Sequence, residues 1–304
     1  MIRSVTVVNH HGESLRMELA RPQTSGFYIE RIEGLGPSLS NINITERATL
    51  DGGYFSSAHT NTRNIVLSLG FWSTGDIEDK RHESYKYFPL KQRISLIIET
   101  DKRTCETHGY VESNDPNIFS SQETTQISIL CPDPYFYAYG AGSTNVTELY
   151  GIVSEFEFPF SNESLIAPRL TLSANYDNSA RNVYNWGDVD VGVIIHARAL
   201  DEVKNPRLYN LTTGESMLIN TNRLATLTGS ALVANDEIVI STIKGSKSIQ
   251  LIRNGVPTNI LNCLDRYTDW IQLRTGANTF MYTAESGTEN MMFKIENQIV
   301  YTGV

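Results

Sequence analysis

The chain has 304 residues, of which 40% are hydrophobic and 19% are charged, and its formal net charge is −9. This length suits two domains rather than one, and the acidic charge argues against binding nucleic acid through its phosphates. No apolar run is long enough for a membrane span, and residues 1–20 lack the apolar stretch of a signal peptide. Three widely spaced cysteines without a CxxC motif indicate thiols of a reducing compartment.

Short strands joined by polar turns make up the first half of the chain. Residues 64–72 alternate apolar side chains on one face, which is typical of a half-buried strand. One helix is predicted over residues 76–88, because Asp76 can cap its start and Pro89 stops it. We therefore expect a β-sandwich or barrel with a single packed helix.

Residues 131–137, which we call the seam, mark the predicted end of the first domain. A strand-like run over residues 125–130 precedes them, and a small-residue stretch follows at residues 140–143. Two prolines end the hydrogen-bond ladder of the strand, because each lacks a backbone N–H. Three aromatic side chains follow, and we expect them to pack the domain junction. These residues are Pro132, Pro134, Tyr135, Phe136 and Tyr137. We expect one domain over residues 1–140 and a second over residues 141–304.

The second half shows almost no helical period. Alternating runs such as residues 189–195 are separated by closely spaced turns rich in glycine and asparagine, for example Asn254-Gly255. Short strands at close, even spacing are the sequence pattern of a β-sandwich. The fold class that we predict is therefore mainly β, with two β-sandwich domains.

No common catalytic motif is present in the sequence. HExxH, a Walker A loop, GxSxG and GxGxxG are all missing, so we predict no enzyme activity, no cofactor and no metal site. Glycoside hydrolases use a pair of carboxylates, and the sequence does not exclude such a pair. Glu155 and Glu157 share a face of a predicted strand and are one candidate. A solvated strand face explains these two residues as well.

Aromatic side chains in the second half raise the question of a glycan site. Trp186 in a turn and Trp270 at a strand start can stack on sugar rings. His196 and Arg198 share one strand face and can bind sugar hydroxyls. The interpretation that we favour is that both tryptophans pack and that His196 and Arg198 lie on a solvated face, because sandwich folds need not retain any site.

An ordered set of segments gives the chain a family resemblance. The set is Gly34-Leu35-Gly36-Pro37, Asp51-Gly52-Gly53-Tyr54, Arg63-Asn64-Ile65, Lys86-Tyr87-Phe88-Pro89, Gly109-Tyr110-Val111-Glu112, Ile118-Phe119-Ser120 and Cys131-Pro132-Asp133-Pro134. It resembles the N-terminal domain of the distal tail protein of siphophages. The second half, with Asn185-Trp186-Gly187-Asp188 and Gly276-Ala277-Asn278, is similar to the galectin-like domain of that family.

The resemblance implies a structural protein of the phage virion and no catalysis. Members of this family form a hexameric ring at the tail tip, which joins the major tail tube protein to the tail-associated hub protein. Their galectin-like domains carry receptor-binding proteins in several phages. Neither a membrane nor a specific nucleic acid sequence is expected as a partner. For the ring contact we expect Tyr54, Phe55 and the Trp72 face to be buried between copies.

Overall fold

The computed structural model describes residues 1–47, 51–72, 76–120, 122–149, 153–154, 173–174 and 180–304. Within this part, the chain divides into one unit of Met1–Ser143 with Val300–Val304 and a second unit of Thr144–Ile299. The sequence pattern placed Val300–Val304 in the second domain. By their contacts they belong to the first unit, because β25 (Val300–Tyr301) pairs with β10 (Phe136–Ala138).

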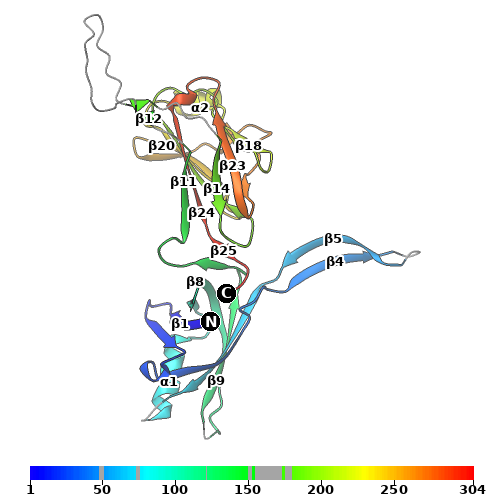
Figure 1. Cartoon of the computed structure of the whole chain (residues 1–304), viewed down its shortest axis with the longest axis vertical. Coiled ribbons are helices and arrows are strands. Elements are labelled where there is room, and N and C mark those ends of the chain that lie inside the picture. Colours follow the sequence, from blue (N-terminus) through cyan, green and yellow to red (C-terminus); the bar gives the residue numbers. More distant parts are fainter. Residues whose placement is uncertain (48–50, 73–75, 121, 150–152, 155–172, 175–179) are drawn as a thin grey trace, which may run out of the picture. The chain divides into compact units, whose positions relative to one another are not determined.

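One large antiparallel sheet, the main sheet, forms the body of the first unit (Figure 1). Among the described residues it has nine strands, with the path β2-β1-β7-β8-β9-β6-β3 and with β10 joining at β8 and β25 pairing with β10. The strands of the path are β1 (Ile2–Val8), β2 (Ser14–Glu18), β3 (Phe27–Glu33), β6 (Arg63–Phe71), β7 (Arg93–Thr100), β8 (Thr104–Pro116) and β9 (Thr124–Cys131).

Strict alternation of apolar residues builds the core of this unit. Along β6, Ile65, Leu67 and Leu69 are buried while the residues between them are less so. The same period in β9 buries Ile127 and Ile129, as expected for strands that cover a core with one face. β9 ends at Cys131, where the two prolines of the seam begin.

The predicted helix is present as α1 (Ile77–Tyr87). Asp76 caps it, since its carboxylate accepts a hydrogen bond of 2.9 Å from the backbone N–H of Glu78. The ammonium group of Lys80 lies 5.5 Å from the centre of the Phe27 ring, and Phe88, just after the helix, is buried in the core. The helix thus covers apolar side chains of the main sheet.

β4 (Ser40–Glu46) and β5 (Gly53–Thr60) form a separate antiparallel ribbon, which we call the hairpin. It extends away from the main sheet of the same unit (Figure 1). All residues of both strands are exposed in the single chain.

The second unit is a sandwich whose two larger sheets contain six and four strands in the described part of the chain. The six-stranded sheet has the order β11 (Thr144–Glu148), β24 (Met291–Gln298), β16 (Ile194–Ala199), β19 (Glu237–Ser241), β20 (Ser248–Arg253), β21 (Val256–Asn259). The four-stranded sheet has the order β14 (Arg181–Asn185), β23 (Gly276–Thr283), β17 (Arg207–Asn210), β18 (Glu215–Leu218). Between the sheets, the rings of Tyr282 and Phe293 lie 4.9 Å apart.

Small elements complete the described part of the second unit. Two short strand pairs are β12 (Val153–Ser154) with β13 (Ser173–Ala174), and β15 (Val191–Gly192) with β22 (Gln272–Leu273). The sequence pattern did not predict α2 (Thr221–Thr228). Its ends follow ordinary rules, because Asn220 caps the start and Gly229 at φ 83° ends it.

The mainly-β sandwich prediction is confirmed. Single-turn 3-10 helices at Pro22–Thr24, Leu261–Cys263 and Thr288–Asn290 accompany α1 and α2 in the described ranges. No helix of the described residues has the length and apolar character that crossing a membrane requires.

Candidate assembly surface

One face of the hairpin is apolar and open to solvent. Cross-strand partners share a face of a ribbon, and Ile42 is paired with Ala58 while Ile44 is paired with Phe55. Ile42, Ile44 and Phe55 are 58%, 61% and 67% exposed. Three large apolar side chains thus lie on one side of a two-stranded ribbon and are exposed to solvent in the described part of the chain.

The opposite face of the hairpin is polar. Asn41 is paired with His59 and Asn43 with Ser57, and the Asn43 amide donates a 2.9 Å hydrogen bond to the Ser57 hydroxyl. Tyr54 also lies on this face, where the Arg47 guanidinium sits 3.6 Å from the centre of its ring. The hairpin is therefore amphipathic across its thickness.

A β-bulge produces this division. The register shifts between Asn43 and Ile44, so that Ser56 is left without a direct partner. Regular alternation from Ala58 would place Tyr54 on the apolar face. The extra residue instead brings Phe55 to that face, beside Ile44.

The long edges of the hairpin are open as well. Within the described ranges, β4 and β5 pair with each other and with no third strand. An exposed strand edge with an apolar face is a template for pairing with another chain. The hairpin therefore has both features of an assembly element.

The structure separates the three residues predicted for the ring contact. Phe55 lies on the apolar face, while Tyr54 next to it points to the polar face. Trp72 follows β6, where its backbone N–H donates to the Gly26 carbonyl at 2.8 Å. Its ring meets Tyr28 of β3 edge-on, with ring centres 6.4 Å apart. Only Phe55 belongs to the apolar face, and Ile42 and Ile44 are the members that sequence reasoning missed.

The seam is held by hydrogen bonds to Asp133. Its carboxylate accepts from the Tyr135 backbone N–H at 3.1 Å and from the Tyr137 hydroxyl. Burial, together with the Asp133 charge, raises the pKa of Tyr137 above its ordinary value. Phe136 is fully buried, while Tyr135 and Tyr137 are half-buried. The seam aromatics thus pack against the first unit.

Arg63 is a buried cation to which the sequence analysis assigned no role, although it begins one of the segments of the family resemblance. Its side chain donates to four backbone carbonyls, those of Gly34, Gly36, Pro134 and Thr302. Its guanidinium also lies 4.3 Å from the centre of the Phe136 ring. Burial is the main cause that lowers the pKa of Arg63 from its ordinary value. A charged residue at the start of an otherwise apolar strand was the only sequence signal.

The four residues considered for a glycan site are not brought together. His196 and Arg198 lie on β16 of the six-stranded sheet. Trp186 follows β14 at the edge of the four-stranded sheet, where its ring stacks on Tyr184 with ring centres 5.2 Å apart. Trp270 precedes β22 and lies under the Lys247 ammonium, 5.0 Å from its ring centre.

His196 and Arg198 already have protein partners. The His196 Nδ1 lies 2.7 Å from a carboxylate oxygen of Glu237. Arg198 donates to the Asn235 side chain at 3.3 Å. These contacts fit the solvated-face interpretation of this strand.

Possible metal ligands are scattered in the described part of the chain. There, no group of three or more His, Cys, Asp or Glu side chains is arranged to hold a metal ion. Glu155 and Glu157, the carboxylates considered for glycoside hydrolysis, lie outside the described residues.

Comparison with known proteins gives a result from structure alone. No protein-family model matches the chain, and no curated protein matches it. The crystal structure of the Dit protein of phage SPP1, described as a paradigm of the hub adsorption apparatus in phages that infect Gram-positive bacteria, is similar with a TM-score of 0.64. The sequence identity is 13%, and the match covers 97% of this chain and 98% of that chain.

Two chains of the phage P2 baseplate in its activated conformation also match. The calcium form shows 12% identity and a TM-score of 0.42, with 98% of this chain and 99% of that chain covered. The strontium form shows 13% identity and a TM-score of 0.43, with the same coverage of 98% and 99%. At these TM-scores the baseplate chains add nothing to the fold assignment.

The SPP1 match extends over both units, because nearly all of each chain is covered. The chain therefore has the fold of the distal tail protein of siphophages, as the ordered segments of its sequence imply.

Proposed function

We propose that this chain is a structural protein of a phage tail tip, where it assembles with copies of itself into a hexameric ring. The observation that carries the proposal is the fold shared with the SPP1 hub protein over 97% of the chain. A fold alone does not determine a function. The apolar face of the hairpin adds a specific surface that assembly would cover.

The hairpin supports a contact between copies for a physical reason. A hydrophobic surface of three large side chains exposed to water is costly, and its burial contributes about 25 cal/mol for each Å² removed from water. In a closed ring, one surface of each copy meets a different surface of the next, so every hairpin has a partner. A two-stranded ribbon is also marginal alone and gains stability when a third strand or an apolar surface covers it.

The proposed partners follow from the place of such a ring in a tail. On one side we propose the major tail tube protein, on the other the tail-associated hub protein, and for the second unit a receptor-binding protein. The location is the virion, and the role is one of attachment without catalysis. We further propose that residues 1–140 are the ring-forming part and that residues 141–304, apart from Val300–Val304, form the galectin-like outer part.

The oligomeric state tests this proposal. Size-exclusion chromatography with light scattering, with and without the tail tube protein, is expected to show a hexameric species. The variants Ile44→Ser and Phe55→Ser remove apolar area from the hairpin and should shift the population toward monomer. Monomers of the variants and of the wild type should melt at the same temperature, since both side chains are exposed in the single chain.

A matched control lies on the other face of the same ribbon. Asn41→Ser changes an exposed residue of the polar face and should leave the hexamer intact. Monomers alone at every concentration, even with the tube protein present, would contradict the ring. Equal losses from Asn41→Ser and Phe55→Ser would contradict the role of the apolar face.

A second candidate function has one observation in its favour. Tyr184 and Trp186 form a stacked pair that is 40% and 65% exposed, and aromatic faces stack on the apolar faces of sugar rings. This supports binding of a cell-wall glycan by the second unit. Titration with soluble cell-wall fragments, followed by tryptophan fluorescence, should show saturable binding that Trp186→Ala removes and that Trp270→Ala leaves unchanged. Binding that is equal in both variants would rule this pair out.

A further inference from the structure

Three segments that are far apart in the sequence meet at Arg63. The first is the turn with Gly34 and Gly36, which leads into the hairpin. The second is the seam, through which the chain leaves the first unit. The third is Val300–Val304, which we call the returning segment. Each of these segments gives at least one backbone carbonyl to the same guanidinium.

The position of Arg63 in the chain adds to this arrangement. It is the first residue of β6 and follows the hairpin closely, whereas Gly34 and Gly36 precede the hairpin. Both roots of the hairpin are therefore bound to one side chain. Arg63 is itself only 2% exposed, so the loss of a carbonyl would leave a buried donor poorly satisfied.

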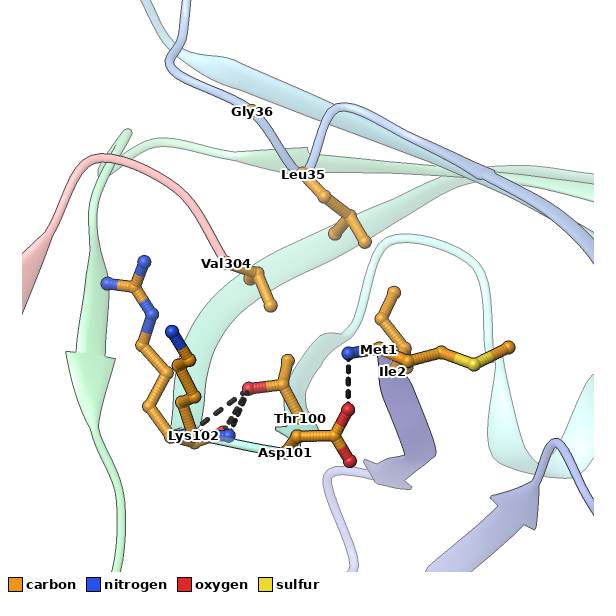
Figure 2. A pocket seen from close by; sticks show the side chains of 9 residues that line it. Met1, Ile2, Leu35, Gly36, Thr100, Asp101, Lys102 and Val304 are labelled. Carbon is orange, nitrogen blue, oxygen red and sulfur yellow. Dashed lines mark hydrogen bonds and ion pairs between the residues drawn. The ribbon is translucent and has the colours of Figure 1, made fainter.

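Further contacts hold the returning segment in the same place. The backbone N–H of Val304 donates to the Leu35 carbonyl at 3.0 Å. Figure 2 shows the side chains of Val304 and Leu35 at one pocket of the first unit, which Gly36 also lines. Tyr301 is paired with Phe136 of the seam, and Phe136 is the ring on which Arg63 lies.

A neutral or unbranched side chain cannot replace this guanidinium. Four carbonyls from three segments require several N–H donors in a fixed planar fork, which arginine provides. Lysine keeps the charge, but it offers one ammonium group and no flat surface for the Phe136 ring. The segments are therefore held together by the shape of this group and not by charge alone.

We propose that Arg63 is a positioning residue that makes the hairpin root, the seam and the returning segment order and disorder as one element. The coupling is a property of the single chain. One consequence rests on the proposed function: docking of the hairpin on a second copy would then stabilise both segments that connect the two units.

Hydrogen exchange of the full-length chain, read by mass spectrometry, tests the coupling. Arg63→Lys should raise exchange in peptides covering residues 34–39, 132–138 and 299–304 together, on the order of tenfold, because each segment loses a charge-assisted hydrogen bond. The control is Arg81→Lys in the same unit. Arg81 is half-buried and paired with Glu123 at 3.0 Å, so its effect should stay near α1 and residue 123.

A second variant perturbs the element from its other end. A Cβ added at Gly303 would lie 3.0 Å from the Leu35 carbonyl oxygen and 3.3 Å from the Gly36 carbonyl carbon. Gly303→Ala should therefore raise exchange in residues 34–39, which supply the nearest atoms, and also in the seam, which supplies none of them. This reciprocity is what coupling requires.

The outcomes are separable. Exchange that rises in only one of the three segments in Arg63→Lys, or a Gly303→Ala effect confined to its own segment, would overturn the proposal. If Arg63→Lys does not fold, Gly303→Ala decides alone. If the wild-type chain is monomeric and the variants still show coupled exchange, the proposed ring is contradicted and the proposed coupling is supported.

Discussion

At the scale of single residues, the ion pair of Asp236 and Arg253 carries the largest expected effect in the second unit. The Asp236 carboxylate is 2% exposed, and Arg253 donates to both of its oxygens as well as to the Ala231 carbonyl. This pairing is the first cause that raises the pKa of Arg253. The pair therefore holds the loop before β19 to the end of β20.

We predict that Asp236→Asn lowers the free energy of unfolding by about 3 kcal/mol, because it leaves a poorly compensated charge in a mostly buried place. Urea denaturation followed by circular dichroism measures the loss. The control is Glu285→Gln, which breaks an exposed pair with Lys204 and should lower the free energy of unfolding far less, because water screens this pair. Equal losses in the two variants would show that burial does not matter here.

The cysteines give a second prediction at this scale. Cys105, Cys131 and Cys263 are all buried. Burial raises the pKa of the Cys131 and Cys263 thiols, so that the unreactive protonated form is favoured at neutral pH. Reaction with a chromogenic disulfide reagent should therefore be slow in native buffer and complete after unfolding. Rapid reaction of one thiol in the native protein would contradict the burial of that side chain.

At the scale of elements, the ends of the short helix α2 are where we expect substitutions to change its stability most. The Asn220 side chain accepts a 3.0 Å hydrogen bond from the Arg223 backbone N–H. Asn220→Ala should lower the free energy of unfolding by about 1 kcal/mol. Asn222→Ala, on the exposed side of the same helix, should be neutral or stabilising since alanine favours helix. Thermal unfolding of both variants decides, and a destabilising Asn222→Ala would contradict the capping role.

Elements with a strong local signal could be predicted from the sequence. The period of two in residues 64–72 gave β6, and Asp76 with Pro89 gave α1, because in both cases the neighbours in the chain determine the structure. The helix α2 has eight residues, too short to show a helical period among polar side chains.

The candidate site was less predictable for two physical reasons. The bulge at Ser56 exchanges the faces of Tyr54 and Phe55, and a bulge has no fixed sequence pattern. Arg63 depends on the Thr302 carbonyl, 239 residues away along the chain, and on backbone groups that carry no residue identity. Contacts of this kind arise only from the fold.

At the scale of the whole molecule, the first unit is built from two separate stretches of the chain. In sequence, Thr144–Ile299 stands between them, and its described residues form a sandwich with its own core. The returning segment gives β10 a second neighbouring strand and gives Arg63 one of its four carbonyls. The second unit is therefore one continuous stretch of the chain, whereas the first unit combines two stretches.

We predict that residues 144–299 expressed alone unfold cooperatively, whereas residues 1–143 alone are less stable than the same residues joined through a flexible linker to residues 299–304. The expected difference is about 2 kcal/mol, since the short fragment loses the pairing with β25 and leaves a buried donor of Arg63 without its acceptor. Urea titrations of the three proteins measure it. The control is the linked form carrying Arg63→Met, which should lose most of this gain because the carbonyl of Thr302 then has no guanidinium to bind. Equal free energies of unfolding for residues 1–143 alone and for the linked form would mean that the returning segment binds the first unit without stabilising it.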